Sequence, residues 1–164
     1  MLKRIVLFAL LVLPLGAFAQ EKVAYFNLRE IYVIMPEFKL MQDSLQRTSA
    51  AMEKELQNLQ DEYTKKYQAF MEEGESLIES IKVRRMQEIQ GLEERTNLFL
   101  EQSRQELERL QVSLSEPIEK KINDAVQAVG TANNFLYILR AEAILYTSPN
   151  AIDATPLVQK YLKL

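Results

Sequence analysis

The sequence predicts an α+β protein that is mainly α-helical, with a long antiparallel helical hairpin attached to a small β-containing body. Two stretches with an apolar heptad repeat occupy the middle of the chain, and a single glycine, Gly74, lies between them. Short strand-like runs precede the first stretch and follow the second. A heptad repeat is typical of a coiled coil, and short strands need partners to be stable. The two ends of the hairpin are therefore expected to meet in one small sheet.

The composition argues against catalysis. The 164 residues include no Cys and no His, so the usual zinc ligands and the commonest general base are missing. The four glycines are scattered singly, and none belongs to a phosphate-binding loop. We therefore expect no enzymatic activity, no metal, no cofactor and no nucleotide.

The N-terminus has the pattern of a secretory signal peptide. Two basic residues at 3–4 precede an apolar stretch at 5–15, and residues 17–19 provide an A-x-A cleavage site. The apolar stretch is shorter than the roughly 20 residues that span a bilayer, which disfavours a membrane anchor. We expect an exported protein cleaved after Ala19.

Cleavage at that point leaves an acidic chain. The leader carries two of the 20 basic residues and none of the 23 acidic ones, so the remaining 18 basic residues give a net charge of −5. A negative charge disfavours nucleic acid as a partner. Without cysteine the chain has no disulfides, and its stability must come from burial or oligomerisation.

The first elements after the leader are short. Residues 22–27, KVAYFN, are predicted to form a strand, and residues 28–35 have apolar spacing that suits one or two helical turns. Pro36 interrupts that helix. A new helix is expected to begin there, because proline is well tolerated in a first helical turn.

The outgoing arm of the hairpin covers residues 37–73, which contain no Pro or Gly. Two apolar series alternate in steps of four and three, which is the a/d seam of a coiled coil. They consist of Leu45, Met52 and Leu59, and of Ser49, Leu56, Tyr63 and Phe70. Lys66 falls where the first series requires an apolar residue, so the seam loosens before the tip.

The turn between the arms is placed at residues 72–76, where Gly74 allows a left-handed helix end. The apolar pattern then resumes from Ile78 to Leu114. One uninterrupted helix is the alternative. It is disfavoured because the seam loses its phase at residues 72–80.

In the C-terminal third, the sequence pattern predicts a helix, two strands and a last helix. Pro117 marks a helix boundary, and residues 118–132 have one apolar face. FLYIL (135–139) and AILYT (143–147) are predicted to be strands that form a hairpin, although no Gly or Asn supplies a tight turn. The Thr-Pro pair at 155–156 suits the N-cap and first residue of a final helix.

The predicted organisation has three parts. Residues 1–19 are the signal peptide, residues 20–36 and 115–164 form an oligomerisation body, and residues 37–114 form the helical hairpin. One strand before the hairpin and two after it make a small sheet with exposed edges. Association between subunits covers such edges, so oligomerisation is expected.

Several of these features resemble the Skp (OmpH-like) family of periplasmic outer-membrane-protein chaperones, over residues 22–164. They are VAYFN near the new N-terminus, a Pro-initiated coiled coil, Pro117, and the block FLYILRAEAILYTSPNAIDATPLV. The block is the specific part, because it has an apolar strand, a strand of A-[VI]-L-Y type, a short loop, D-x-T and a helix. The family usually has Gly before this block, where the chain has Asn134, and Asn also tolerates a left-handed helix end.

The resemblance implies a periplasmic homotrimer that acts without ATP. Its strands would build a barrel-like body, and three helical arms would enclose unfolded outer-membrane proteins. The acidic charge is a departure, since the best-known members of the family are basic. A structural coiled-coil protein of the envelope, without client-holding activity, is the alternative.

Candidate client contacts are apolar residues in excess of what a two-helix seam buries. They are Tyr67, Phe70, Met71, Leu77, Ile78, Ile81, Leu98 and Phe99. Successive helix positions point about 100° apart, so at least one residue of the apolar run 98–100 must leave the seam. The alternative is that most of these side chains pack against the other arm.

Two further groups of residues are assigned. Lys82, Arg84 and Arg85 form a basic cluster near the tip, which is a candidate contact for lipopolysaccharide, lipid phosphates or acidic client segments. A solvated helix face balanced by nearby glutamates is the alternative. The body core and subunit interface are assigned to Val23, Tyr25, Phe26, Phe135, Tyr137, Leu139, Ile144 and Tyr146.

Overall fold

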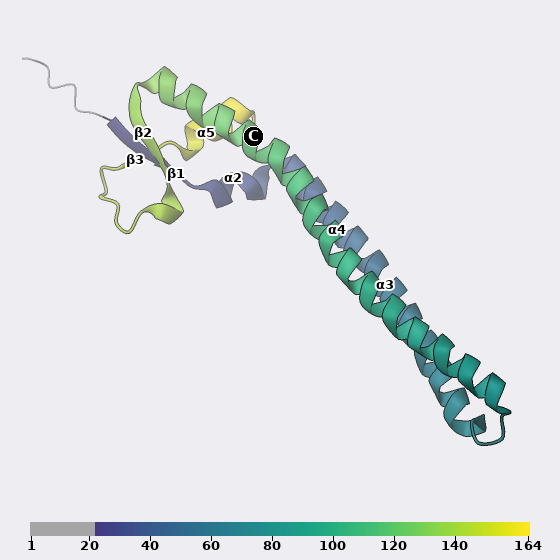
Figure 1. The fold of residues 1–164 in the computed structure, drawn as a ribbon. Coiled ribbons are helices and arrows are strands. Elements are labelled where there is room, and N and C mark those ends of the chain that lie inside the picture. Colours follow the sequence, from purple (N-terminus) through teal and green to yellow (C-terminus); the bar gives the residue numbers. More distant parts are fainter. Residues whose placement is uncertain (1–21) are drawn as a thin grey trace, which may run out of the picture. The chain divides into compact units, whose positions relative to one another are not determined.

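The structure, a computed structural model, describes residues 22–164, which form two compact units (Figure 1). The sheet unit contains residues 22–31 and 122–164, and the hairpin unit contains Tyr32–Lys121. Long helices and a small three-stranded sheet confirm the predicted, mainly helical α+β class. The predicted signal peptide and its cleavage site lie outside the described residues.

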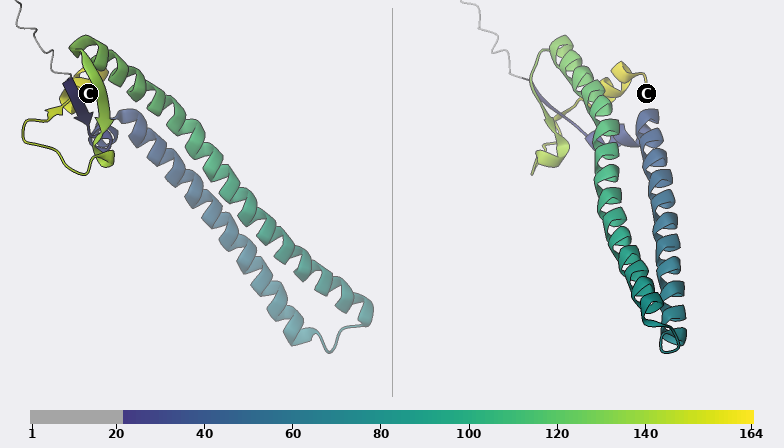
Figure 2. Two further views of the ribbon diagram at one scale, coloured as in Figure 1. Left: turned by 60° about the vertical axis from the view of Figure 1, so that its left-hand side comes forward. Right: turned by 45° about the vertical axis from the view of Figure 1, so that its right-hand side comes forward.

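Two long helices make the predicted antiparallel hairpin. They are α3 (Pro36–Glu73) and α4 (Glu79–Asn133), of which the part up to Lys121 belongs to the hairpin unit. Figure 2 shows the two helices side by side from two further directions. The antiparallel register is visible in three ion pairs between the helices: Glu37 with Lys121, Lys66 with Glu88, and Glu73 with Arg85.

The heptad seam is the line along which α3 and α4 meet. Leu59 and Leu92 are buried there, and the other apolar seam residues of α3 are partly buried. Lys66, the charged residue in the seam, reaches across to Glu88, with 3.1 Å between Nζ and Oε2. A two-helix seam covers a narrow stripe of each helix, so most of the remaining helical surface is in solvent.

The tip of the hairpin, residues 72–79, consists of the end of α3, a connection at residues 74–78 and the first residue of α4. Gly74 does not take the left-handed conformation that we expected: its φ of −58° and ψ of −33° are right-handed. Glycine is required for space instead, because an added Cβ would lie 2.4 Å from the backbone oxygen of Phe70. Ser76 closes the turn by donating its N–H and its hydroxyl to the carbonyl oxygen of Glu73, at 3.0 and 2.7 Å.

The predicted helix boundary at Pro117 is wrong, because α4 continues through it. Proline removes one backbone hydrogen bond and crowds the carbonyl four residues earlier, which belongs to Ser113. Both residues are exposed. The loss therefore falls on the solvated side of a long helix whose neighbouring turns are intact, and it does not end the helix.

The sheet has the order β2-β1-β3, and its strands are parallel. They are β1 (Lys22–Phe26), β2 (Phe135–Arg140) and β3 (Ile152–Asp153). The predicted strand at 143–147 and its hairpin are wrong: a 3₁₀ turn, η1 (Ala141–Ala143), follows β2, and the third strand comes later. A hairpin there lacks tight-turn residues, whereas β1 has two edges that parallel strands can pair with.

The core of the sheet unit lies where β1, α2 (Leu28–Ile34), the end of α4 and α5 (Thr155–Leu162) each contribute buried residues. Alternate residues of β1 are buried, and those of α4 recur at steps of three and four. This confirms the apolar face predicted for residues 118–132. The buried apolar residues of the unit are Ala24, Phe26, Ile31, Ile122, Ala125, Val129, Ala154 and Val158.

The D-x-T run joins the start of α5 to the end of β1. Thr155 is not the N-cap we predicted: it is the first residue of α5, and its Oγ1 accepts a hydrogen bond of 2.9 Å from the Asn27 N–H. Asp153 Oδ1 accepts from the Thr155 N–H at 2.8 Å. The Ala154 N–H donates to the Tyr25 carbonyl oxygen at 2.7 Å. Three backbone N–H groups are thereby satisfied by this short run and its neighbours.

Asn134 follows α4 with a φ of 53°, which confirms the expected left-handed helix end. We predict that Asn134→Gly leaves the free energy of unfolding unchanged or raises it slightly. Asn134→Val should lower it by about 1–2 kcal/mol, because a Cβ-branched residue is strained in this conformation. Urea denaturation of the two variants measures the difference, and equal stabilities would contradict the prediction.

Candidate functional site

Half of the apolar residues predicted as contacts are open to solvent in the hairpin unit. They are Tyr67, Met71, Ile78 and Leu98, with exposed fractions of 44%, 63%, 67% and 58%. The others are partly buried, namely Phe70, Leu77, Ile81 and Phe99. In the run 98–100, the outer two residues are exposed and Phe99 turns toward the seam. The hairpin unit therefore carries large apolar side chains that its own seam leaves uncovered.

A strip of adaptable apolar side chains runs along the end of α3. Tyr63, Tyr67 and Met71 follow one another at four-residue steps, so they lie on one face of the helix. The rings of Tyr63 and Tyr67 are stacked, with centroids 5.9 Å apart. Methionine fits partners of varied shape because its side chain is unbranched and polarisable. Such a strip suits apolar partners that share no fixed sequence.

Ile78 places another apolar side chain at the tip. Its carbonyl oxygen accepts hydrogen bonds from the Ile81 and Lys82 N–H groups, at 3.0 and 3.1 Å, so it immediately precedes α4. Its side chain stays in solvent. The tip combines this residue with glutamates at positions 72, 73, 75 and 79.

The predicted basic cluster is partly neutralised by glutamates. Arg85 Nη1 lies 2.9 Å from Glu73 Oε2, and Arg84 Nε lies 3.7 Å from Glu88 Oε1. Glu88 also accepts a hydrogen bond from Lys66, and that bond together with the Lys66 charge lowers the pKa of the Glu88 carboxyl. These pairs favour the interpretation of a solvated, charge-balanced helix face for this part of the hairpin.

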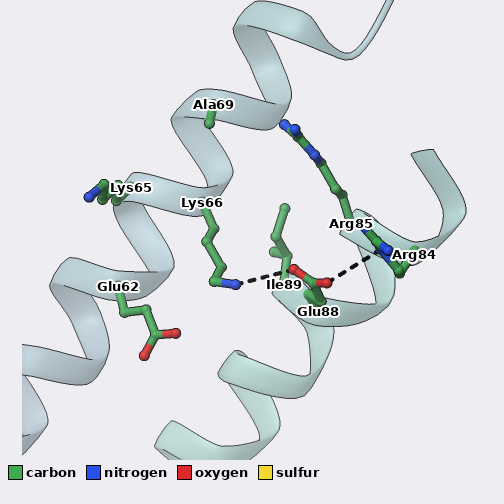
Figure 3. A pocket seen from close by; sticks show the side chains of 8 residues that line it. All are labelled: Glu62, Lys65, Lys66, Ala69, Arg84, Arg85, Glu88 and Ile89. Carbon is green, nitrogen blue, oxygen red and sulfur yellow. Dashed lines mark hydrogen bonds and ion pairs between the residues drawn. The ribbon is translucent and has the colours of Figure 1, made fainter. Parts of the chain in front are cut away.

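Arg84 and Arg85 line an open groove of about 510 Å³ between α3 and α4, which Figure 3 shows from close by. We call it the basic groove; its lining is Glu62, Lys65, Lys66, Ala69, Arg84, Arg85, Glu88 and Ile89. The basic cluster predicted from the sequence did not include Lys65 and Lys66, because they lie on the other arm. The antiparallel register of the two arms places Lys66 opposite Glu88, so the group can be found only when that register is known.

A second groove, of about 370 Å³, was not predicted and lies at the other end of the hairpin unit. It is lined by Glu37, Leu40, Met41, Leu114, Pro117, Ile118 and Lys121. Glu37 Oε1 accepts a hydrogen bond from Lys121 Nζ, and Glu37 Oε2 is buried without a partner among the described residues. Leu40 is 68% exposed and lies off the heptad seam, which is why the periodicity did not indicate it.

The Glu37–Lys121 pair makes the hairpin unit less stable in acid. The hydrogen bond from Lys121 holds the pKa of Glu37 below its usual value of 4.5. The ionised carboxylate therefore stabilises the fold above that value, and the stabilisation is lost as the pH falls through the lower folded-state pKa. An exposed pair of this kind contributes less than about 1 kcal/mol.

We predict that Glu37→Gln reduces the loss of unfolding free energy between about pH 6 and pH 3. Urea denaturation at each pH measures this dependence. Glu119→Gln is the matched control, because Glu119 lies in the same unit and makes no ion pair among the described residues. A pH dependence in Glu37→Gln equal to that of the unmodified protein would contradict the assignment.

Most residues assigned to the body interface lie on the surface of the sheet unit. Phe26 is the exception, because it is buried in the core. Tyr25, Phe135 and Ile144 are partly buried, and the exposed members are Val23, Tyr137, Leu139 and Tyr146. Leu136 and Leu145 are also exposed and were not among the predicted interface residues. Exposed apolar side chains that gather on one surface are typical of interaction sites.

Neither a metal site nor a membrane span is found in the described part. Among residues 22–164, no group of three or more His, Cys, Asp or Glu side chains could hold a metal ion. None of the helices described there is both long enough and apolar enough to cross a membrane.

Comparison with known proteins gives a consistent result. Residues 22–162 match the family described as outer membrane protein (OmpH-like). A relative from Pectobacterium atrosepticum, named chaperone protein Skp, is 26% identical over 145 residues, which cover 88% of this chain and 87% of the relative. A solved OmpH-like structure from Caulobacter crescentus has the same fold, with a TM-score of 0.74 at 16% identity, over 88% of this chain and 85% of that one. The resemblance inferred from the sequence is thus confirmed, and the chain belongs to the OmpH-like family.

Proposed function

We propose that the protein is an ATP-independent periplasmic holdase that binds unfolded outer-membrane β-barrel proteins before they enter the membrane. The observation that carries this proposal is the set of large apolar side chains left in solvent on the hairpin unit, Tyr67, Met71, Ile78 and Leu98. The family match and the similarity to a relative named as a chaperone support it. Residues 1–19 would direct the export that this location requires.

The chemistry of the clients fits such a surface. Strands of a membrane β-barrel alternate apolar and polar residues, and the apolar ones cannot be buried before insertion. Weak contacts at several points hold such a chain through effective concentration rather than through one tight site. Release needs no nucleotide, because the client is more stable in the bilayer.

Assembly into a homotrimer would give the client a cavity between arms. The exposed apolar residues of the sheet unit support association between subunits, and so do the outer edges of β2 and β3, which pair with no strand of residues 22–164. The interface residues would be Val23, Tyr137, Leu139 and Tyr146, with strands contributing to a barrel-like body. Multi-angle light scattering of the exported protein measures the mass, and a monomer or dimer would contradict the trimer.

The proposed activity is tested by diluting a denatured outer-membrane barrel protein, without nucleotide, in the presence and absence of this chain. We expect light scattering from client aggregates to fall as the protein approaches the client concentration. An equal mass of an unrelated coiled-coil protein is the control for crowding. Unchanged aggregation would leave the alternative, a structural protein of the envelope.

A further inference from the structure

The negative charge of the protein is concentrated on the hairpin unit. Residues 32–121 contain 18 acidic and 13 basic residues, a net charge of −5. Residues 22–31 and 122–164 contain four acidic and five basic residues, a net charge of +1. The surface proposed to hold clients is therefore acidic, whereas the unit proposed to join subunits is nearly neutral.

Few of these carboxylates are neutralised by the fold. Within the described hairpin unit, the ion pairs engage the carboxylates of Glu37, Glu73 and Glu88. The tip holds three further glutamates, at positions 72, 75 and 79, which are exposed and make no ion pair among the described residues. An exposed, unpaired carboxylate projects its full charge into the surrounding solvent.

The apolar contacts lie within this negative region. Met71 is followed by Glu72, and Ile78 is followed by Glu79. Neighbouring Cα atoms are about 3.8 Å apart, which is well inside a Debye length of about 8 Å at physiological salt. A client segment that touches these side chains therefore meets the field of the adjacent carboxylates before salt screens it.

The basic groove opposes this field locally. Its lining has four basic and two acidic side chains, and three of the four basic ones already pair with Glu73 or Glu88. The groove is thus a limited positive area on a unit whose total charge is negative. The net charge of the hairpin unit sets its long-range attraction for a partner. Because that charge is negative, the unit attracts positively charged partners.

We propose that the hairpin unit selects its clients by charge, and that it prefers unfolded barrel chains of net positive charge. This inference rests on the holdase function proposed above and adds the chemical class of its substrate. Apolar side chains supply contact with any client, while the carboxylates attract cationic segments and repel anionic ones. Basic segments flanked by apolar residues fit the alternation of Met71, Ile78 and glutamates at the tip.

One client prepared in three charge versions tests the proposal. Substitutions confined to the loops and turns of a β-barrel protein give positive, neutral and negative versions with identical apolar residues. Binding of each fluorescently labelled, urea-diluted version to the exported protein is measured at low and high salt. We expect about tenfold tighter binding of the positive than of the negative version at low salt, with the ratio approaching one near 1 M salt.

The outcomes separate the two proposals. Equal affinities at low salt, or tighter binding of the negative version, would overturn the charge preference and leave the holdase function intact. If no version binds at any salt concentration, the holdase function itself is overturned.

Variants of the protein give an independent readout. The triple change Glu72→Gln, Glu75→Gln and Glu79→Gln should weaken binding of the positive client about three- to tenfold at low salt. The affinity for the neutral client should not change. The opposite change, Lys65→Gln with Lys82→Gln, is the matched control and should strengthen binding of the positive client. Circular dichroism checks that the helices are intact. Equal affinity of both variants for the positive client would contradict the proposal.

Discussion

Thr155→Val is expected to lower the free energy of unfolding of the sheet unit by about 1–3 kcal/mol. Valine keeps the shape of threonine and removes the hydroxyl, so the Asn27 N–H loses the acceptor that it meets at 2.9 Å. Thr155 is 1% exposed, so water has little access to take the place of that acceptor. A donor left unsatisfied in such a place costs more than the net value of an ordinary hydrogen bond.

Hydrogen exchange provides the local measurement for this prediction. The Asn27 amide should exchange faster in Thr155→Val, whereas amides in the middle of α3 should be unchanged. Thr155→Ser is the control, because it retains the hydroxyl and loses one methyl group. If the valine and serine variants are equally stable and protect the Asn27 amide equally, the hydrogen bond does not have the assigned role.

The largest effect on activity is expected from Tyr67→Ser combined with Met71→Ser. Both side chains lie on the exposed strip of α3, and their removal should shorten the lifetime of the client complex about three- to tenfold. Stability should change little, because neither side chain is buried: 44% of Tyr67 and 63% of Met71 is in solvent. The change is measured by transfer of a labelled client from the variant to an excess of the unmodified protein.

Val112→Ser is the matched control for this pair. Val112 is also exposed on the hairpin unit, with 59% of its surface in solvent, and lies outside the proposed contacts. Client lifetime should be unchanged in this variant. A double variant that retains clients as long as the unmodified protein would remove Tyr67 and Met71 from the contact surface.

The long helices could be predicted because their signal is local and repeated. Each heptad position of α3 indicates the same face, so one irregular residue such as Lys66 does not change the outcome. The errors in the predicted helices occurred where the preference of a single residue competes with packing against distant parts of the chain. Proline usually ends a helix, yet Pro117 is exposed and α4 continues through it in both directions.

The strands were harder to predict, because a strand is defined by its partner. Residues 143–147 have strand-like composition and pair with nothing in the described chain, whereas the two-residue β3 pairs with β1. Gly74 shows a similar limit: glycine indicated a turn correctly, but the reason is the approach of the Phe70 carbonyl oxygen and not a left-handed backbone.

The exposed contacts were partly predictable from helix geometry. The run 98–100 must place at least one apolar residue outside the seam, and Leu98 is exposed as a result. The basic groove could be predicted only with the register between the arms, which places Lys66 opposite Glu88. The groove at Glu37 and Lys121 depends on how the start of α3 packs against α4 near Lys121, and neither the periodicity nor the charge pattern contains that information.

The parallel sheet has a consequence for the order in which the chain folds. Lys22 of β1 pairs with Phe135 of β2, so β1 is separated from its first partner by more than a hundred residues of chain. Helical hairpins form from contacts that are local along the chain, and closure of a long flexible loop is unfavourable. The hairpin should therefore form first and bring the distant strands together. Until then, β1 exposes two unpaired edges, and the incompletely folded chain is itself prone to aggregation.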